Sequence, residues 1–170
     1  MTPTDKDVTF QVVDIKHGTT VDGPGFRTSI YFAGCSHHCP ECHNPHTWDG
    51  DAGTTYTLSE LMQIIRENAM PVTFSGGDPL FRPLQLLELA RKLRQEKYDI
   101  WCYTGYTFEA LLNDPIRRKL LDYINVLVDG PFVTAQRDTS LLFRGSSNQR
   151  IIDVGATMVN SEITLWEFDF

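Results

Sequence analysis

The sequence predicts an α/β fold in which mostly parallel strands form a partial, open barrel. Short apolar runs alternate along the chain with amphipathic helical patterns, as expected for βαβ units. Each unusual motif follows the end of such a run, where parallel sheets place their sites. The chain has 170 residues, fewer than the roughly 250 of a full eight-unit barrel. We expect residues 1–170 to form a single domain, with residues 150–170 as a C-terminal extension.

Six short runs are predicted to form strands because they are rich in β-branched and aromatic residues. The first, with the sequence RTSIYFA, leads directly into a cysteine-rich loop. The next three are followed by glycines, as strands are where they enter tight turns. The last two are the weaker candidates. In chain order the predicted strands cover residues 27–33, 71–75, 99–104, 124–128, 150–154 and 163–168.

Three helices are predicted between these strands. Thr57 and Glu60 form a capping box, in which each side chain satisfies a free backbone N–H of the other residue. Pro83 suits the first turn of a second helix, because its missing N–H is not needed there. The pair Asp114-Pro115 opens a third helix. Basic residues along the second helix are interpreted as a solvated face.

Composition and charge exclude several classes of function. With 15 Lys+Arg against 22 Asp+Glu, the net charge is −7, which disfavours nucleic-acid partners and anionic membrane surfaces. The N-terminus has neither the basic nor the apolar region of a signal peptide, and no apolar stretch approaches the length of a membrane span. We therefore expect a cytoplasmic protein, without nucleic-acid or membrane partners, whose cysteines stay reduced.

Three cysteines, Cys35, Cys39 and Cys42, fall within one short loop together with several histidines. A structural zinc site takes four ligands, often as two separated pairs, and no second pair follows. A [4Fe–4S] cluster usually takes four cysteines, so three would leave one iron open to another ligand. The residues alone leave three possibilities: an open iron–sulfur site, a Cys3His zinc site that uses His43, or no metal. We interpret Cys102 as a small buried hydrophobe.

The remaining histidines of the loop, His37 and His38, lie between the cysteines and are interpreted as loop surface.

The segments on both sides of the cysteine loop, and those that follow later strands, resemble motifs of a known family. They read VDGPGFR, CHNPHTW, SGGDPL, IWCYTGY, INVLVDG and FRGSSNQR. The first three, with the cysteine spacing, resemble radical S-adenosylmethionine (SAM) enzymes that activate glycyl-radical enzymes. The others resemble the activating proteins of anaerobic ribonucleoside-triphosphate reductases. The resemblance covers about residues 10–150.

This resemblance implies a specific activity, that of an oxidoreductase with a protein substrate. Cys35, Cys39 and Cys42 would hold a [4Fe–4S] cluster whose open iron binds SAM. Reductive cleavage of SAM would give a 5′-deoxyadenosyl radical, which takes a hydrogen atom from a glycine of the anaerobic ribonucleotide reductase. The partners implied are this reductase and a small electron-donor protein.

The resemblance also implies residues that bind SAM or the partner. Glu41 stands where many radical SAM enzymes have an aromatic residue, so its contact is expected through the backbone. The paired glycines leave room for backbone carbonyls to approach the SAM ammonium. The predicted SAM-binding residues are Glu41, Cys42, His43, Gly76, Gly77, Asp78, Thr104 and Asp129. Those predicted to line the mouth of the site or dock the partner are Arg144, Ser146, Ser147, Asn148 and Gln149.

Two alternative functions stay open at this point. One is a small-molecule radical SAM enzyme, such as a 7-carboxy-7-deazaguanine synthase, which is also short and has a similar cysteine loop. The other is a zinc-binding module without catalytic activity. The CHN sequence that begins at Cys42 and the segment at residues 143–149 favour the activase.

Overall fold

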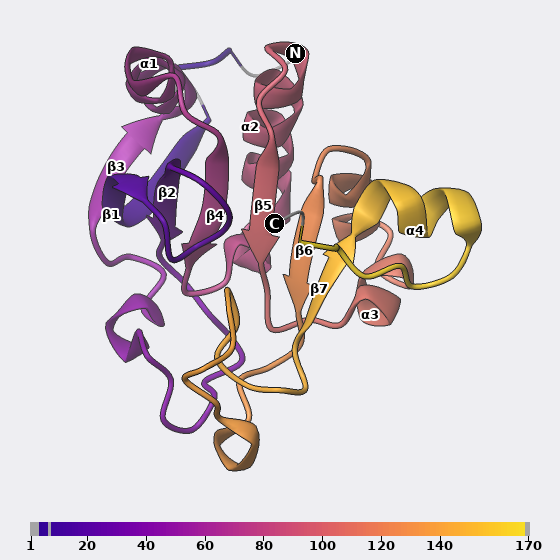
Figure 1. The fold of residues 1–170 in the computed structure, drawn as a ribbon. Helices are drawn as coiled ribbons and strands as arrows, with labels where there is room; N and C mark the ends of the chain where they lie inside the picture. Colours follow the sequence, from indigo (N-terminus) through magenta and orange to yellow (C-terminus); the bar gives the residue numbers. More distant parts are fainter. Residues whose placement is uncertain (1–3, 7, 169–170) are drawn as a thin grey trace.

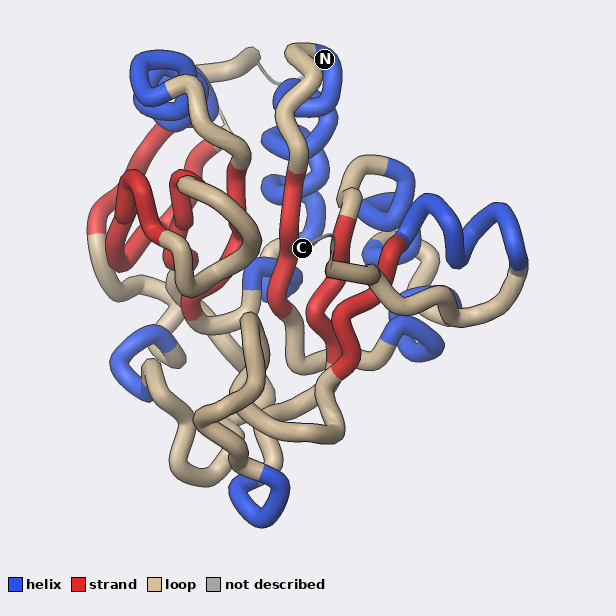
Figure 2. Tube along the Cα trace, in the orientation of Figure 1, coloured by secondary structure: helices blue, strands red, loops and turns tan. Residues whose placement is uncertain are grey.

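The computed structural model describes residues 4–6 and 8–168. Residues 1–3, 7 and 169–170, which include both ends of the predicted 1–170 domain, lie outside the described residues. Within the described part, seven strands form one sheet in the order β3-β1-β2-β4-β5-β6-β7 (Figures 1 and 2). The strands are β1 (Thr9–Thr19), β2 (Arg27–Phe32), β3 (Thr54–Thr57), β4 (Val72–Gly76), β5 (Ile100–Tyr103), β6 (Val126–Asp129) and β7 (Arg150–Asp153).

The four central strands, β2, β4, β5 and β6, are parallel, whereas β1, β3 and β7 pair antiparallel at the two sides. The sheet is not closed, so the predicted open α/β barrel is confirmed. Five predicted strands correspond to β2, β4, β5, β6 and β7 with small shifts at their ends. The strands β1 and β3 are not predicted from the sequence, because charged and polar side chains interrupt their runs of apolar residues.

The prediction of a strand at residues 163–168 is wrong. This segment makes only an isolated bridge, between Leu165 and Ile152 of β7. Two backbone hydrogen bonds flank the bridge: Asp153 donates to the carbonyl of Thr164 at 2.9 Å, and Trp166 donates to that of Ile151 at 2.8 Å. The segment then leaves the edge of β7, and Figure 1 shows it crossing in front of β7 and β6.

The two long helices begin where the sequence predicts them. They are α1 (Leu58–Asn68) and α2 (Pro83–Gln95), and the capping box of α1 is complete: Thr57 accepts from the Glu60 N–H, and Glu60 accepts from the Thr57 N–H at 2.7 Å. The third predicted helix is instead a 3-10 helix, η3 (Arg117–Asp122). Two short helices were not predicted, α3 (Phe108–Leu112) and α4 (Val154–Asn160). None of the helices in the described residues is long and apolar enough to cross a bilayer.

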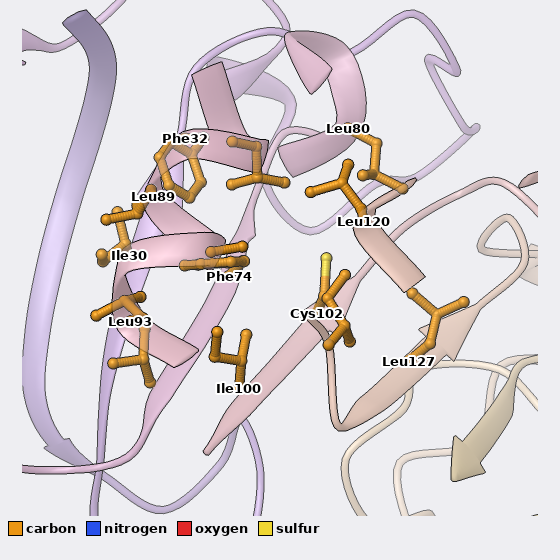
Figure 3. Close-up of a cluster of buried hydrophobic side chains, with 14 of the residues drawn as sticks. Ile30, Phe32, Phe74, Leu80, Leu89, Leu93, Ile100, Cys102, Leu120 and Leu127 are labelled. Carbon is orange, nitrogen blue, oxygen red and sulfur yellow. The ribbon is translucent and has the colours of Figure 1, made fainter. Parts of the chain in front are cut away.

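The two faces of the sheet bury different clusters. On one face α1, α2 and η3 cover the main core, where Cys102 lies among Phe74, Ile100, Leu120 and Leu127 (Figure 3). The opposite face carries a second, aromatic cluster, whose buried residues are Trp101, Val126, Val128 and Ile151. Because strand residues alternate between faces, neighbours on β5 belong to different clusters.

The chain after α4 completes the aromatic cluster. The ring of Trp166 lies 4.9 Å from that of Trp101, and the ring of Phe168 stacks 5.8 Å from that of Phe143. Phe143 belongs to the long connection between β6 and β7. The C-terminal segment therefore supports a connection that, as described below, forms one wall of the site.

We expect the capping box to contribute measurably to stability. Replacing Thr57 by Ala removes the hydroxyl that accepts from Glu60, which should lower the free energy of unfolding by about 1 kcal/mol. Urea unfolding of the purified protein measures this difference. Ser59→Ala, at an exposed position in the first turn of the same helix, is the control and should change stability by less than about 0.5 kcal/mol. Equal losses in the two variants would contradict the prediction.

Candidate active site

The motifs singled out in the sequence meet at one edge of the sheet. The cysteine loop follows β2, the glycine pair ends β4, and further glycine turns follow β5 and β6. In Figure 1 the cysteine loop and the connection between β6 and β7 both lie below the arrowheads of β4, β5 and β6. A cavity of about 410 Å³ opens between them, and its walls include Cys35, Cys39 and Cys42. The three predicted cluster ligands thus share one cavity.

Short backbone contacts close the base of the cysteine loop. The N–H of Gly34 donates to the carbonyl of Thr47 at 2.7 Å, and that of Cys35 donates to the carbonyl of Trp48 at 3.2 Å. Within the loop, the N–H of Cys42 donates to the carbonyl of Cys39 at 3.1 Å. All these cysteines are free thiols. The loop therefore folds back on itself, and its three cysteines line the same cavity.

Backbone N–H groups donate hydrogen bonds to the sulfur atoms of Cys35 and Cys42. Burial raises the pKa of the Cys35 thiol, and hydrogen bonds from the backbone N–H groups of His37 and His38 oppose that shift. In addition, the N–H of Asn44 donates to the sulfur of Cys42 at 3.4 Å. Hydrogen bonds to cysteine sulfurs are one of the means by which proteins set the potential of an iron–sulfur cluster.

In the described part of the chain, the cavity offers buried polar atoms to a bound group but no ready-made set of ligands for a single metal ion. Among the described residues, no three His, Cys, Asp or Glu side chains are grouped so that they could hold one metal ion. A cluster spreads its ligands more widely, around a cavity. Two residues of the cavity wall, Trp48 and Tyr103, also have buried polar atoms for which the described residues provide no hydrogen-bond partner. Such atoms are expected to pair with something that binds there.

Cys102 does not belong to this site. Its side chain is fully buried in the helix-covered core, and burial raises the pKa of its thiol well above the usual range. The interpretation of Cys102 as a buried hydrophobe agrees with this position. In the described residues the cavity wall therefore contains three cysteines and no fourth.

The carboxylate of Asp78 lies where three segments meet, and only 2% of the residue is exposed. His37 of the cysteine loop is hydrogen-bonded to it, with 2.7 Å between Nε2 and Oδ2. The hydroxyl of Thr104 and the N–H of Gly105, both after β5, donate to the same oxygen at 2.9 and 3.0 Å. The N–H of Leu80 donates to Oδ1 at 2.9 Å. The carboxylate thus ties the cysteine loop to the ends of β4 and β5.

His37 is a functional residue that the sequence reasoning missed. It was interpreted as loop surface, but its ring is largely covered: it bonds Asp78 and meets the edge of Tyr106 at 4.5 Å. The pairing joins residues 41 positions apart, so no local pattern reveals it. His38 is exposed as expected, and its ring stacks on Trp48 at 4.4 Å.

The paired glycines are required by the protein's own backbone. A Cβ at Gly77 would lie 2.4 Å from the carbonyl oxygen of Gly34 and 2.8 Å from that of Thr47. A Cβ at Gly76, where φ is +110°, would lie 2.3 Å from the nitrogen of Phe32. The space that glycine leaves is thus filled by β2 and the cysteine loop, although both glycines also line the cavity.

The other predicted SAM-binding residues divide into two groups. Cys42, His43 and Thr104 line the cavity together with the glycines. Glu41, Asp78 and Asp129 are not part of its described wall. Glu41 is exposed with a left-handed backbone, whereas Asp129 is buried against Arg150, at 2.6 Å. Whether any of these residues binds SAM stays a prediction.

The connection between β6 and β7, residues 130–149, forms the facing wall. Its Thr134 hydroxyl donates to the carbonyl of Pro40 at 3.1 Å, and its Phe132 ring lies 5.2 Å from that of His43. Of the predicted mouth residues, Arg144 and Gln149 line the cavity. The other three are placed differently: Ser146 is buried and accepts from the Val133 N–H, Ser147 is exposed, and Asn148 donates to the carbonyl of Pro131.

Comparisons with known proteins agree with this geometry. A family model described as a 4Fe-4S single cluster domain matches residues 21–152. The anaerobic ribonucleoside-triphosphate reductase-activating protein of Escherichia coli K12 is 40% identical over 139 residues, which cover 76% of this chain and 89% of that protein. The protein of the same name from Vibrio cholerae is 40% identical over 142 residues, covering 77% and 90%. That of Enterobacteria phage T4 is 34% identical over 140 residues, covering 77% and 86%.

The chain belongs to the family of anaerobic ribonucleoside-triphosphate reductase-activating proteins. Membership in this activating-protein family makes it an enzyme of the radical SAM type, with a [4Fe–4S] cluster and SAM as cofactors. The three cavity-lining cysteines and the unpaired polar atoms fit these groups. The iron–sulfur interpretation is thereby favoured over the Cys3His zinc site.

One solved structure is similar to this chain in its fold. The crystal structure of QueE from Escherichia coli matches with a TM-score of 0.50 and 19% sequence identity, over 58% of this chain and 53% of that one. The match spans about half the length of that structure, and at this identity it concerns the fold alone. It supports the open α/β barrel fold.

We expect only the three loop cysteines to be needed for the cluster. Each of the variants Cys35→Ala, Cys39→Ala and Cys42→Ala should fail to assemble a full cluster. Three thiolates already leave one of the four irons without a cysteine ligand, and a variant would leave two. Iron and sulfide analysis after anaerobic reconstitution measures this. Cys102→Ala is the matched control and should retain its iron. Loss of iron from the Cys102 variant would overturn the ligand assignment.

We expect Asp78 to act on the fold of the site. Asp78→Ala leaves the four groups that now hydrogen-bond to its carboxylate without a partner. Each buried donor left unpaired lowers the free energy of unfolding by about 1–3 kcal/mol. The free energy of unfolding should therefore fall by at least about 2 kcal/mol even in the cluster-free protein, as measured with urea. Asp122→Ala, at an exposed carboxylate, should change it by less than about 0.5 kcal/mol. An unchanged stability for Asp78→Ala would mean that this carboxylate serves a ligand instead.

Proposed function

We propose that this chain is the activase that makes the glycyl radical of an anaerobic ribonucleoside-triphosphate reductase. The observation that carries the proposal is the meeting of three free loop cysteines, and no fourth among the described residues, in one cavity at the ends of parallel strands. The names of relatives that are 40% identical over about three quarters of the chain support the reductase as its target.

When bound, the cluster and SAM supply one-electron radical chemistry that can remove a hydrogen atom from glycine. The protein's task is then to bind, orient and exclude water. Cys35, Cys39 and Cys42 would hold the cluster, and the polar atoms of the cavity wall would hold SAM. The aromatic rings of Tyr103 and Phe143 form an apolar part of that wall, which limits the water around a reactive intermediate.

The open side of the sheet suits a substrate that is itself a protein. The sheet ends at β3 on one side and at β7 on the other, so a complete barrel does not enclose the site. At the rim of the cavity Val21 is 69% exposed, so an apolar side chain is available to a partner. We infer that Arg144 and Gln149 face the incoming glycine segment, and that Ser146 and Asn148 hold their loop in shape.

Two further parts of the proposal concern the setting. The electron must come from a separate donor, and a small electron-donor protein is expected to supply it. Because cysteines oxidised to disulfides could not bind the cluster, we also propose that the chain works in a reducing compartment such as the cytoplasm. The acidic balance of the chain, with a net charge of −7, supports a protein partner over nucleic acid.

The decisive experiment combines the reduced, cluster-loaded protein with SAM and a candidate anaerobic reductase. A glycyl-radical signal in electron paramagnetic resonance, dependent on SAM and on Cys35, Cys39 and Cys42, is the expected result. SAM cleavage without any signal on the reductase would favour the small-molecule radical SAM enzyme. Protein that carries zinc alone and never cleaves SAM would contradict both.

A further inference from the structure

Tyr103, the last residue of β5, contributes both its ring and its hydroxyl group to the surroundings of the cavity. Alternation along the strand buries Ile100 and Cys102 in the helix-covered core and turns Trp101 and Tyr103 to the opposite face. There the ring of Tyr103 packs against the aromatic cluster, and the residue also forms part of the cavity wall. It therefore connects the apolar interior of the open barrel to the site.

The hydroxyl of Tyr103 is buried, yet it forms no hydrogen bond with any of the described residues. A second tyrosine on the same face, Tyr31 of β2, shows the usual arrangement, because its hydroxyl donates to the carboxylate of Asp22. Buried hydroxyl groups are nearly always paired in native proteins. The unpaired phenol at the cavity wall therefore indicates a partner that arrives with a ligand.

The protonation state of Tyr103 leaves its hydroxyl able to donate a hydrogen bond to such a partner. Burial raises the pKa of its phenol well above the usual range, and the nearby Asp22 carboxylate raises it further. The group thus keeps its proton at any working pH and offers one O–H donor. A neutral donor in a protected position pairs best with an acceptor oxygen.

We propose that the Tyr103 hydroxyl donates a hydrogen bond to an acceptor oxygen of SAM bound in the cavity. This rests on the proposed function, since SAM is the polar ligand of that site. SAM carries acceptor oxygens in two parts, the methionyl carboxylate and the ribose hydroxyls. Tyr103 is then a residue that positions SAM, in addition to the strand-end residues predicted from sequence.

The test replaces only the hydroxyl, in Tyr103→Phe. Binding of labelled SAM to the cluster-loaded but unreduced protein, measured by equilibrium dialysis, should weaken about three- to tenfold, the usual effect of one hydrogen bond. The cluster-free protein should melt at the same temperature as the parent or higher, because an unpaired buried hydroxyl contributes nothing to the fold. A tyrosine with a purely structural role would show the reverse pattern.

Two variants serve as matched controls. Tyr31→Phe removes a hydroxyl that is already paired with Asp22, so its cluster-free form should melt at a lower temperature. Tyr123 packs against the helix-covered core, away from the cavity wall. Tyr123→Phe should therefore leave SAM binding unchanged. If Tyr103→Phe destabilises the cluster-free protein as much as Tyr31→Phe does, the hydroxyl has a partner in the fold and the proposal is wrong.

A second ligand tells the two acceptors apart. 5′-Methylthioadenosine keeps the ribose and lacks the methionyl carboxylate. If Tyr103→Phe weakens SAM alone, the acceptor is the carboxylate; if it weakens both ligands, the acceptor is on the ribose, and either result supports the proposal. Unchanged SAM affinity in Tyr103→Phe would overturn it. If the parent protein itself fails to bind SAM, the proposed function fails first, so the two failures are distinguishable.

Discussion

The site depends on one buried carboxylate. Asp78 accepts hydrogen bonds from residues that belong to the cysteine loop, to the turn after β5 and to its own turn after β4. A buried charge is stable only when its neighbours satisfy it, so these three segments hold one another in a single arrangement. The cysteine loop, which has no regular secondary structure between β2 and the short helix at Pro45–Thr47, gains a fixed position from this contact.

The close approach of two backbone segments, at Gly34 and Gly77, also fixes the position of the cysteine loop. At Gly77 the chain after β4 runs so close to Gly34 that the Asp78 N–H donates to the Gly34 carbonyl at 2.7 Å. Any side chain at Gly77 would push the base of the cysteine loop outwards. A substitution such as Gly77→Val is therefore expected to disturb the loop and the cluster, and could not report on SAM contact alone. The SGGDPL segment acts as much on the cluster loop as on the cofactor.

The sequence allowed prediction of what is local and left the rest open. The parallel strands and the capping box of α1 follow from short patterns, and the cysteine spacing alone indicates a metal centre. By contrast, the contact between His37 and Asp78 joins residues 41 positions apart, and strand β1 carries charged residues such as Asp14 and Lys16 that hide its pattern. Pairings of this kind depend on tertiary packing, which one sequence does not display.

The two neighbours Cys102 and Tyr103 show why the face of a strand decides a residue's role. Cys102 has the chemistry of a ligand, but its face is closed by α2 and η3. Tyr103, one position later, faces the site, and below it Trp101 rests on Trp166. Trp166 and Phe168, which pack on Trp101 and Phe143, lie beyond residue 152 and therefore outside the segment matched by the family model. The shared part of the chain thus provides the cysteines, while the C-terminal segment, from its own aromatic residues, closes the sheet face beneath the cavity.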